Sequence, residues 1–373
     1  MKYSTIVVSV VMLTAITTSC KKEGCTDSSA TNYNKKAKKD DGSCQYVSDR
    51  KAILAEVGTN VISATYTDLA NKTSNLYDAV NDFIANPSAA GLANCRDLWK
   101  TSRSAWERSE GFLFGPVSTD DIDPRIDTWP VDFNALENML SSSTDFSVDA
   151  NIDALDDALK GFHPIEYLLW GTNGTKSFSD FTAREKEYLK ALTKNVKKLT
   201  SDLVIGWNTS ASASYYASFS APGSSNTFYP TMKSAFEELV NGIAGICDEV
   251  ANGKISEPFT MQDPSLEESP YSQNSIKDFT DNIRSIENIY LGKYASDGKG
   301  LEDLVREHNL ALDNTIKTKI NNAITKLQAI TDPFGTAISS QATLVQNAID
   351  AINDLKSTLE GELLPFVQQY VTD

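Results

Sequence analysis

The sequence predicts an all-α fold made of two helical bundles. Apolar residues recur at spacings of three and four through most of the chain after residue 50, which is the periodicity of helices with one buried face. Turn signals separate these segments, as at Asn86-Pro87, Ala221-Pro222-Gly223 and Asp332-Pro333. No run of alternating apolar and polar residues indicates a sheet.

The amino terminus has the layout of a bacterial secretory signal. An apolar run over residues 6–16 follows Lys2 and is too short to span a bilayer as a stable helix. Ser19 directly precedes Cys20, as in the lipobox of a lipoprotein. We therefore expect residues 1–19 to be a signal peptide and Cys20 to carry a lipid anchor. The alternative is an ordinary signal peptide that contains a cysteine.

Residues 20–48 are predicted to form a tether closed by a disulfide. The segment has too few apolar residues to hold a fold by burial, and it resembles a short cysteine-closed module of exported bacterial proteins. In an oxidising compartment Cys25 and Cys44 should pair. Cys95 and Cys247 remain, and they either bridge the two halves of the chain or stay apart as buried free thiols, because pairing requires Cα atoms within about 7 Å.

The rest of the chain reads as helix almost throughout. At this length two domains are favoured over one bundle, so we predict a first bundle over residues 49–205 and a second over 206–373. The predicted helices are 52–83, 89–113, 152–170, 181–207, 232–251, 276–290, 301–330 and 337–370.

An internal repeat supports this division. Residues 165–171 align without gaps to residues 286–292 with three identities, which sets a His-x-x-Glu pattern opposite an Arg-x-x-Glu pattern. We therefore expect pseudo-twofold symmetry between the bundles. The alternative is chance similarity between two amphipathic helices. A pocket between the bundles would gather His163, Glu166, Arg284 and Glu287.

The clearest local signal for function is the segment Gly161-Phe162-His163-Pro164-Ile165-Glu166, which contains one of only two histidines. His163 and Glu166, at i and i+3, share one face of a helix. Pro164 cannot donate a backbone hydrogen bond, so the helix either starts with Pro164 at its first position or kinks there. A break of this kind beside two ionisable side chains favours a functional site over a scaffold feature.

A second polar stripe precedes this segment. Arg103, Glu107 and Glu110 lie at i, i+4 and i+7, on one face of a helix. An exposed Arg103–Glu107 ion pair would add little stability. The stripe lies between Trp99 and Phe112, however, which indicates that it is partly buried.

Several motifs in order resemble the imelysin, or M75, family of exported bacterial proteins, whose signature is Gly-x-His-x-x-Glu. The resemblance implies a metal or small-ligand site at His163 and Glu166, helped by Glu107 or Glu110 and by the segment that holds Ser272, Ser275 and Asp278. It covers about residues 51–373, and its motifs are residues 161–166, Trp99-x3-Arg103-x2-Trp106-Glu107-x2-Glu110, Ile126-Asp127-x-Trp129-Pro130 and the segment from Ser269 to Ser275.

An imidazole with two or three carboxylates is a metal-ligand set, and oxygen-rich sets suit harder ions such as iron or manganese, with zinc and calcium as alternatives. The His-Glu-x-x-His helix of common zinc proteases and the paired Glu-x-x-His set of di-iron bundles are both absent from the sequence. In the family, imelysin was named for a proposed metallopeptidase activity, while related proteins belong to iron-uptake systems.

We therefore expect an envelope lipoprotein, on the periplasmic side or at the cell surface, that binds iron and works with partner proteins of iron uptake. Its contact with the membrane is expected through the lipid anchor alone. The first alternative is an M75-type metallopeptidase. A second is a degenerate member of the family that only binds a partner.

Other functional classes find little support. The chain has 50 acidic and 34 basic residues, a formal net charge of -16 and no basic stripe, so nucleic acid is not an expected partner. Ser272 and Ser275 lack the Gly-x-Ser-x-Gly turn of a hydrolase nucleophile. Ser275 is instead expected to cap the helix that begins near Ile276.

Overall fold

The computed structural model describes residues 22–28 and 30–372. The predicted signal peptide, residues 1–19, and the predicted lipid anchor, Cys20, lie outside the described residues.

The chain divides into two compact units, one up to Val47 and one from Ser48 onward. In the first unit a disulfide joins Cys25 to Cys44. Among the described residues, all of the helices belong to the second unit. Of the two alternatives for the other cysteines, the structure shows buried free thiols at Cys95 and Cys247.

The predicted all-α class is confirmed. Over the described residues there is no β-strand, only an isolated bridge between Glu23 and Lys39 in the first unit. The helices are α1 (Arg50–Glu56), α2 (Ala64–Ala85), α3 (Ala89–Glu107), α4 (Pro116–Thr119), α5 (Asp123–Asp127), α6 (Phe133–Ser141), α7 (Asp149–Asp153), α8 (Phe162–Trp170), α9 (Ala183–Gly206), α10 (Tyr215–Ser220), α11 (Met232–Asp248), α12 (Ser256–Met261), α13 (Ser275–Leu291), α14 (Leu301–His308), α15 (Leu310–Gln328), α16 (Phe334–Ser340), α17 (Ala342–Thr358) and α18 (Leu364–Tyr370), with π-helical segments at Val57–Ser63, Glu249–Ile255 and Leu359–Leu363.

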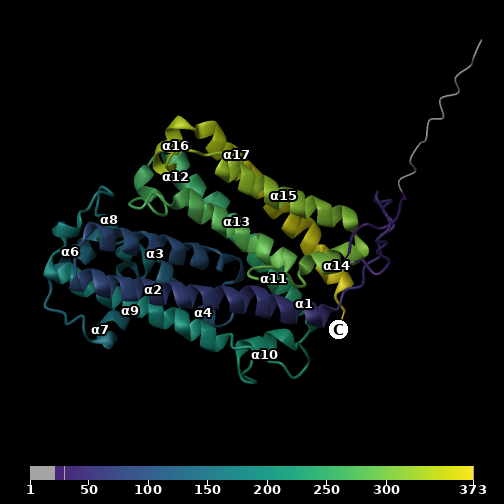
Figure 1. Cartoon of the computed structure of the whole chain (residues 1–373), viewed down its shortest axis with the longest axis horizontal. Helices are drawn as coiled ribbons and strands as arrows, with labels where there is room; N and C mark the ends of the chain where they lie inside the picture. Colours follow the sequence, from purple (N-terminus) through teal and green to yellow (C-terminus); the bar gives the residue numbers. More distant parts are fainter. Residues whose placement is uncertain (1–21, 29, 373) are drawn as a thin grey trace, which may run out of the picture. The chain divides into compact units, whose positions relative to one another are not determined.

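The helices of the second unit form two groups (Figure 1). Helices α2, α3, α8 and α9 pack together in one group, and α11, α13, α15 and α17 pack together in the other. Helix α3 contacts α13 across the groups, so side chains from both groups meet there. The boundary between residues 205 and 206 and the pseudo-twofold symmetry stay predictions.

Buried polar bonds join α3 to α13. The hydroxyl of Ser104 and the Nε of Arg108 donate to the carboxylate of Asp281, at 2.6 and 2.9 Å. The amide of Asn282 donates to Oε2 of Glu107 at 2.5 Å. These bonds fix the polar face of α3 opposite α13, because breaking one would leave a buried polar group without a partner.

Four predicted helices are wrong in extent. The segment 89–113 is helical only to Glu107, where α3 ends, and a separate 3-10 turn follows at Glu110–Phe112. The segment 152–170 consists of the end of α7, a 3-10 turn and α8: the chain leaves the helix after Asp153, and Gly161, with a positive φ of 87°, precedes the start of α8. The segment 301–330 breaks at Asn309, whose side chain accepts from the backbone of Leu312 and caps α15. The segment 337–370 begins earlier, as α16, and breaks at Gln341, after which α17 continues through the last π-helical segment into α18.

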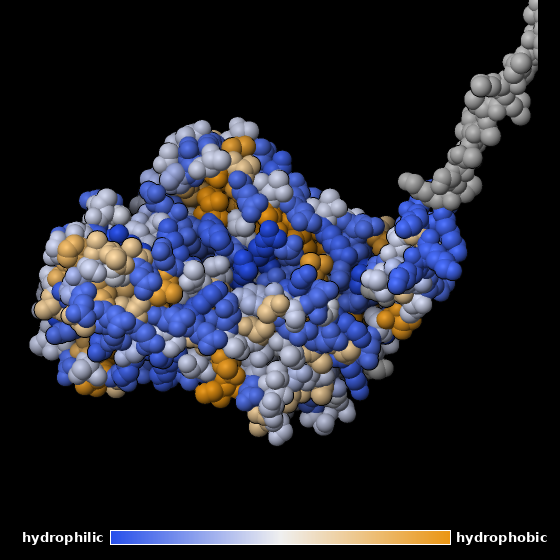
Figure 2. Space-filling view, viewed as in Figure 1, coloured by the Kyte–Doolittle hydropathy of each residue, from blue (hydrophilic) through white to orange (hydrophobic). Residues whose placement is uncertain are grey.

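Most of the surface on the visible face is hydrophilic, and the apolar patches on it are separate from one another (Figure 2). This agrees with the excess of acidic residues. Within the described part of the chain, no helix has the length and apolar character needed to cross a membrane.

Candidate metal centre

Gly161 determines where α8 begins. Its φ of 87° belongs to the left-handed region, which side chains other than hydrogen rarely adopt. A Cβ at this position would stand 2.1 Å from the backbone oxygen of Ile126. The start of α8 therefore lies directly against the end of α5, which brings His163 next to Asp127. Pro164 is the third residue of α8, within the first turn, where its missing N–H costs no helical bond.

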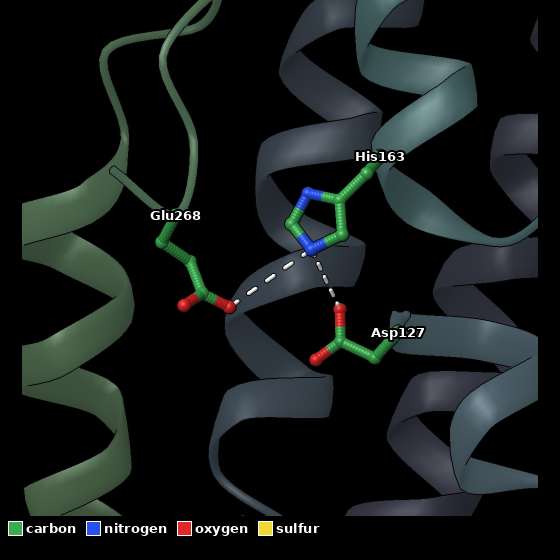
Figure 3. Close-up of side chains that lie close together, drawn as sticks. All are labelled: Asp127, His163 and Glu268. Atoms are coloured by element: carbon green, nitrogen blue, oxygen red, sulfur yellow. Dashed lines mark ion pairs between the residues drawn. The ribbon is translucent and has the colours of Figure 1, made fainter. Parts of the chain in front are cut away.

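Three side chains from separate parts of the chain meet at this point (Figure 3). Nε2 of His163 lies 3.1 Å from Oδ1 of Asp127 and 3.9 Å from Oε1 of Glu268. Asp127 ends α5, His163 lies in the first turn of α8, and Glu268 lies in the loop before α13. One ligand atom of each residue lies within 4.8 Å of the others, close enough to share one metal ion.

The imidazole of His163 is fully buried, and neither ring nitrogen makes a hydrogen bond of acceptable geometry. Nδ1 lies 3.9 Å from Oε2 of Glu166, which also lacks a hydrogen-bond partner. The ring of Trp129 packs on the imidazole with centroids 4.9 Å apart. Unpaired buried donors and acceptors are rare and costly, and a metal ligand needs such a free nitrogen.

Charge around His163 affects its proton affinity in opposite directions. Burial and the nearby Arg103 lower the pKa of His163, but the carboxylates of Asp127 and Glu166 outweigh them and raise it to about 9. Although burial acts to raise the pKa of Asp127, Arg103 and His163 hold it below its ordinary value. Without a metal the pair is therefore a carboxylate beside an imidazolium, and a metal ion would take the place of the proton.

Glu166 is oriented by Ser272. The backbone N–H and the hydroxyl of Ser272 both donate to Oε1 of Glu166, at 2.7 and 2.6 Å. The other oxygen, Oε2, is left toward His163. This arrangement holds the carboxylate in one orientation, as the outer hydrogen bonds of metal sites do.

Arg103 is the central cation of the site. Its guanidinium is fully buried and pairs with Glu107 and Asp127, and it lies 2.6 Å from Oε1 of Glu268. Nε also lies 3.9 Å from Oδ1 of Asp278. The predicted Arg103–Glu107 pair is thus part of a buried network and not an exposed ion pair, so its loss would be costly.

A cavity of about 410 Å³ opens beside the cluster. Asp127 and Glu268 of the cluster line it. So do Glu110, which is 5% exposed, and Lys254. The remaining polar lining is acidic as well, from Asp123, Glu249 and Glu257.

Buried carboxylates outnumber buried cations in this region. The difference must be neutralised by protons or by a bound cation, because uncompensated buried charge is unfavourable. Burial accordingly raises the pKa of Glu107 to about 8, that of Asp278 to about 7 and that of Glu110 well above its ordinary value. The carboxylates are Glu107, Glu110, Asp127, Glu166, Glu268 and Asp278, and the cations are Arg103, Lys254 and protonated His163.

Most of the predicted site residues gather here. His163, Glu166, Arg103, Glu107, Ser272 and Asp278 lie in the network or contact it, and Glu110 lines the cavity.

Three predicted residues lie elsewhere. Arg284 pairs with Glu287 on the partly exposed side of α13, and neither is a contact of His163. Ser275 does not cap α13, whose N-cap is Asn274; its hydroxyl donates to Glu267 at 2.8 Å and accepts from the backbone of Ser269.

Sequence reasoning missed Asp127, Glu268 and Lys254 as site residues. A signal existed for Asp127, which belongs to the quoted motif Ile126-Asp127-x-Trp129-Pro130, and for Glu268, which directly precedes the Ser269 motif. Nothing in the sequence pattern indicates Lys254.

Comparisons with known proteins show the family of the chain and agree with the fold. The model of the imelysin family, peptidase M75, matches residues 62–359. Iron-regulated protein A of Synechococcus elongatus is 30% identical over 317 residues, which cover 83% of this chain and 84% of that protein.

Solved structures are similar over most of their length. A Parabacteroides distasonis protein that carries the name iron-regulated protein A precursor superposes with a TM-score of 0.78 at 29% identity, over 88% of this chain and 97% of that one. An imelysin-like protein from Psychrobacter arcticum 273-4 superposes with a TM-score of 0.70 over 88% of this chain and 99% of that one, and at 13% identity it supports the fold alone.

Proposed function

The chain belongs to the imelysin family, and on that premise we propose that it is an envelope protein that binds a metal ion, iron before others, at Asp127, His163 and Glu268. In this proposal the bound metal is cargo, and the protein takes part in its uptake.

One observation carries the proposal. His163 is completely buried among carboxylates, with Nε2 3.1 Å from Oδ1 of Asp127, and neither ring nitrogen makes a hydrogen bond of acceptable geometry. A nitrogen and two carboxylate oxygens within 4.8 Å of one another form a mixed donor set that suits iron or manganese. Zinc and calcium remain alternatives, and calcium is the less suited because it prefers all-oxygen ligands.

The relatives favour iron among these metals. Two similar proteins carry iron-regulated protein A in their names. A protein whose synthesis responds to iron fits a role in acquiring it. We extend that role to this chain on the strength of its buried donor set.

The envelope is the proposed place of action. The predicted signal peptide and Cys20 would anchor the protein to a membrane by lipid alone, facing the periplasm or the cell exterior. Partner proteins of iron uptake would deliver or receive the metal. The net charge of -16 argues against nucleic acid as a partner.

The alternative function is an M75-type metallopeptidase. A metal held by three side chains beside a cavity would keep open positions for water, as catalytic metal sites do. Against it, the sequence lacks the His-Glu-x-x-His helix of the common zinc proteases.

Metal titration tests the proposal. We would measure metal content by elemental analysis and affinity by calorimetry with Fe²⁺, Zn²⁺, Mn²⁺ and Ca²⁺, comparing wild type with His163→Ala and Glu268→Gln. His308→Ala is the matched control, since His308 is the other histidine and stacks on Tyr370 far along the chain. We expect saturable binding that both site variants lose and the control keeps. A folded wild type that binds none of the four metals would contradict the proposal, and hydrolysis of an unstructured protein by the loaded wild type would favour the peptidase.

A further inference from the structure

Lys254 lies at the edge of the metal site on an unusual piece of helix. Helix α11 continues into the π-helical segment Glu249–Ile255 and then into α12. π-Helical turns are rare and occur often at functional sites. The side chain of Lys254 is only 11% exposed and lines the cavity beside the cluster.

The ammonium of Lys254 holds an oxygen that a metal would need. Nζ lies 3.2 Å from Oε1 of Glu268, the same oxygen that faces His163 at 3.9 Å. Arg103 also contacts this oxygen, at 2.6 Å. A metal ion bound to this oxygen would stand next to the ammonium, and two cations at such a distance repel strongly in a buried site.

Three cations lie at Glu268, namely Arg103, Lys254 and protonated His163, and Lys254 is the one able to leave. Arg103 is held by four carboxylates and is completely buried. Besides Glu268, Lys254 lies 3.3 Å from Glu249, whose side chain is half exposed, and 3.9 Å from the buried Glu107. The flexible four-carbon stem of a lysine allows the ammonium to move within its reach.

Glu110 is a place for the displaced ammonium. Its side chain is 95% removed from solvent, lines the same cavity and has no hydrogen bond or ion pair with any described residue. Burial raises the pKa of Glu110 well above its ordinary value, and Lys254 is the strongest influence that lowers it, so an ammonium that came closer would favour the ionised carboxylate.

We propose that Lys254 is an internal counter-cation: it occupies Glu268 in the metal-free protein and moves to Glu110 and Glu249 when a metal ion binds. This inference rests on the proposed metal site. The exchange moves one positive charge within the cavity. Glu268 therefore faces the ammonium of Lys254 before metal binding and the metal ion after it. The exchange sets the affinity of the site and selects ions of charge two or three, which displace an ammonium, over monovalent ions.

Affinity measurements on charge variants test the exchange. We would titrate the full-length protein with Mn²⁺, and anaerobically with Fe²⁺, using wild type, Lys254→Gln, Lys254→Met, Glu110→Gln and the double variant Lys254→Gln/Glu110→Gln. Lys277→Gln is the matched control, because Lys277 is half exposed and pairs with Asp281 on α13. Lys254→Met keeps the apolar stem, so it separates charge from packing.

We expect both Lys254 variants to bind the metal at least tenfold more tightly than wild type, and the control to bind unchanged. Glu110→Gln should weaken metal binding severalfold in the wild-type background. In the Lys254→Gln background the same substitution should weaken binding by less than a third of that factor, because that variant has no ammonium that needs a new partner.

Three results would overturn the inference. Unchanged or weaker binding by folded Lys254 variants would show that the ammonium is not displaced. Equal losses from Glu110→Gln in both backgrounds would make Glu110 a metal ligand and not an acceptor of the ammonium. A wild type that binds no metal would remove the proposed function together with this inference, whereas the first two results leave the metal site intact.

Discussion

Gly161 and Ile126 lie so close that a single added carbon atom on Gly161 would be 2.1 Å from the backbone oxygen of Ile126. This contact connects α8 to α5 and thereby sets His163 beside Asp127. The glycine of the Gly-x-His-x-x-Glu motif therefore has a steric role, separate from the metal-binding role proposed for the histidine.

We expect Gly161→Ala to lose at least about 2 kcal/mol of unfolding free energy, because the substitution combines a strained backbone conformation with a backbone clash. It should also lose metal binding, since α5 and α8 must separate. Urea unfolding and calorimetry measure the two effects. Gly245→Ala is the control, because no atom lies within 4 Å of the added carbon and the residue is inside α11. Equal stability of the two variants would show that the contact is not needed.

Arg103→Met should be among the most destabilising single changes, by about 3–5 kcal/mol at pH 8, because it leaves several buried carboxylates without their cation. Without the cation the pKa values of these carboxyls rise in the folded state, so the folded state takes up protons as the pH falls. The loss should therefore shrink between pH 8 and pH 5. Urea unfolding at both pH values measures it, with Arg284→Met as the partly exposed control. A loss that does not vary with pH would point to packing alone.

Asp123→Asn should stabilise the metal-free protein at high pH. Burial, with Asp127 and Glu249 nearby, raises the pKa of Asp123 from 3.8 to about 6, so its ionised form opposes folding above that pH. We expect a gain of about 1–2 kcal/mol at pH 8 that declines below pH 6 and vanishes only at about pH 3 or below, where the carboxyl is protonated in both states. Thermal unfolding across this range measures it, against Asp97→Asn on an exposed position of α3. A constant gain at all pH values would contradict the electrostatic cause.

Ser272→Ala should weaken metal binding about tenfold without abolishing it. The variant removes the hydroxyl bond to Oε1 of Glu166 but keeps the backbone bond, so the carboxylate loses part of its orientation. Stability should fall by about 1–2 kcal/mol, as for a buried hydrogen bond to a charged group. Ser265→Ala, an exposed loop position, is the control for both titration and unfolding. Unchanged affinity would show that the orientation of Glu166 does not matter for the metal.

Local patterns predicted the helices and half of the site. The 3.6-residue periodicity of α2, α9 and α11 is long and continuous, so these elements followed from sequence. His163 and Glu166 also followed, because both lie on one short helix. Asp127 and Glu268 could not be predicted in this way. Asp127 lies in the short helix α5 and Glu268 lies in a loop, so no helical periodicity places either residue near His163.

The repeat was misleading about Arg284. Arg284 aligns with His163 in the sequence. This alignment does not determine, however, which face of the helix packs against the neighbouring bundle. In the structure Arg284 and Glu287 satisfy each other on the partly exposed side of α13. The polar residues that α13 directs at α3 are Asp278, Asp281 and Asn282.

The partners of Arg103 determine when the site can assemble during folding. Glu268 and Asp278 lie more than 160 positions beyond Arg103, so the guanidinium finds them only after both helical groups have formed and docked. Contacts of such long range form late in folding. In the exported protein proposed above, a chain that is still crossing a membrane would therefore have no assembled metal site. Metal would be loaded only where folding is completed, which would protect the chain from taking up metal in the compartment where it is made.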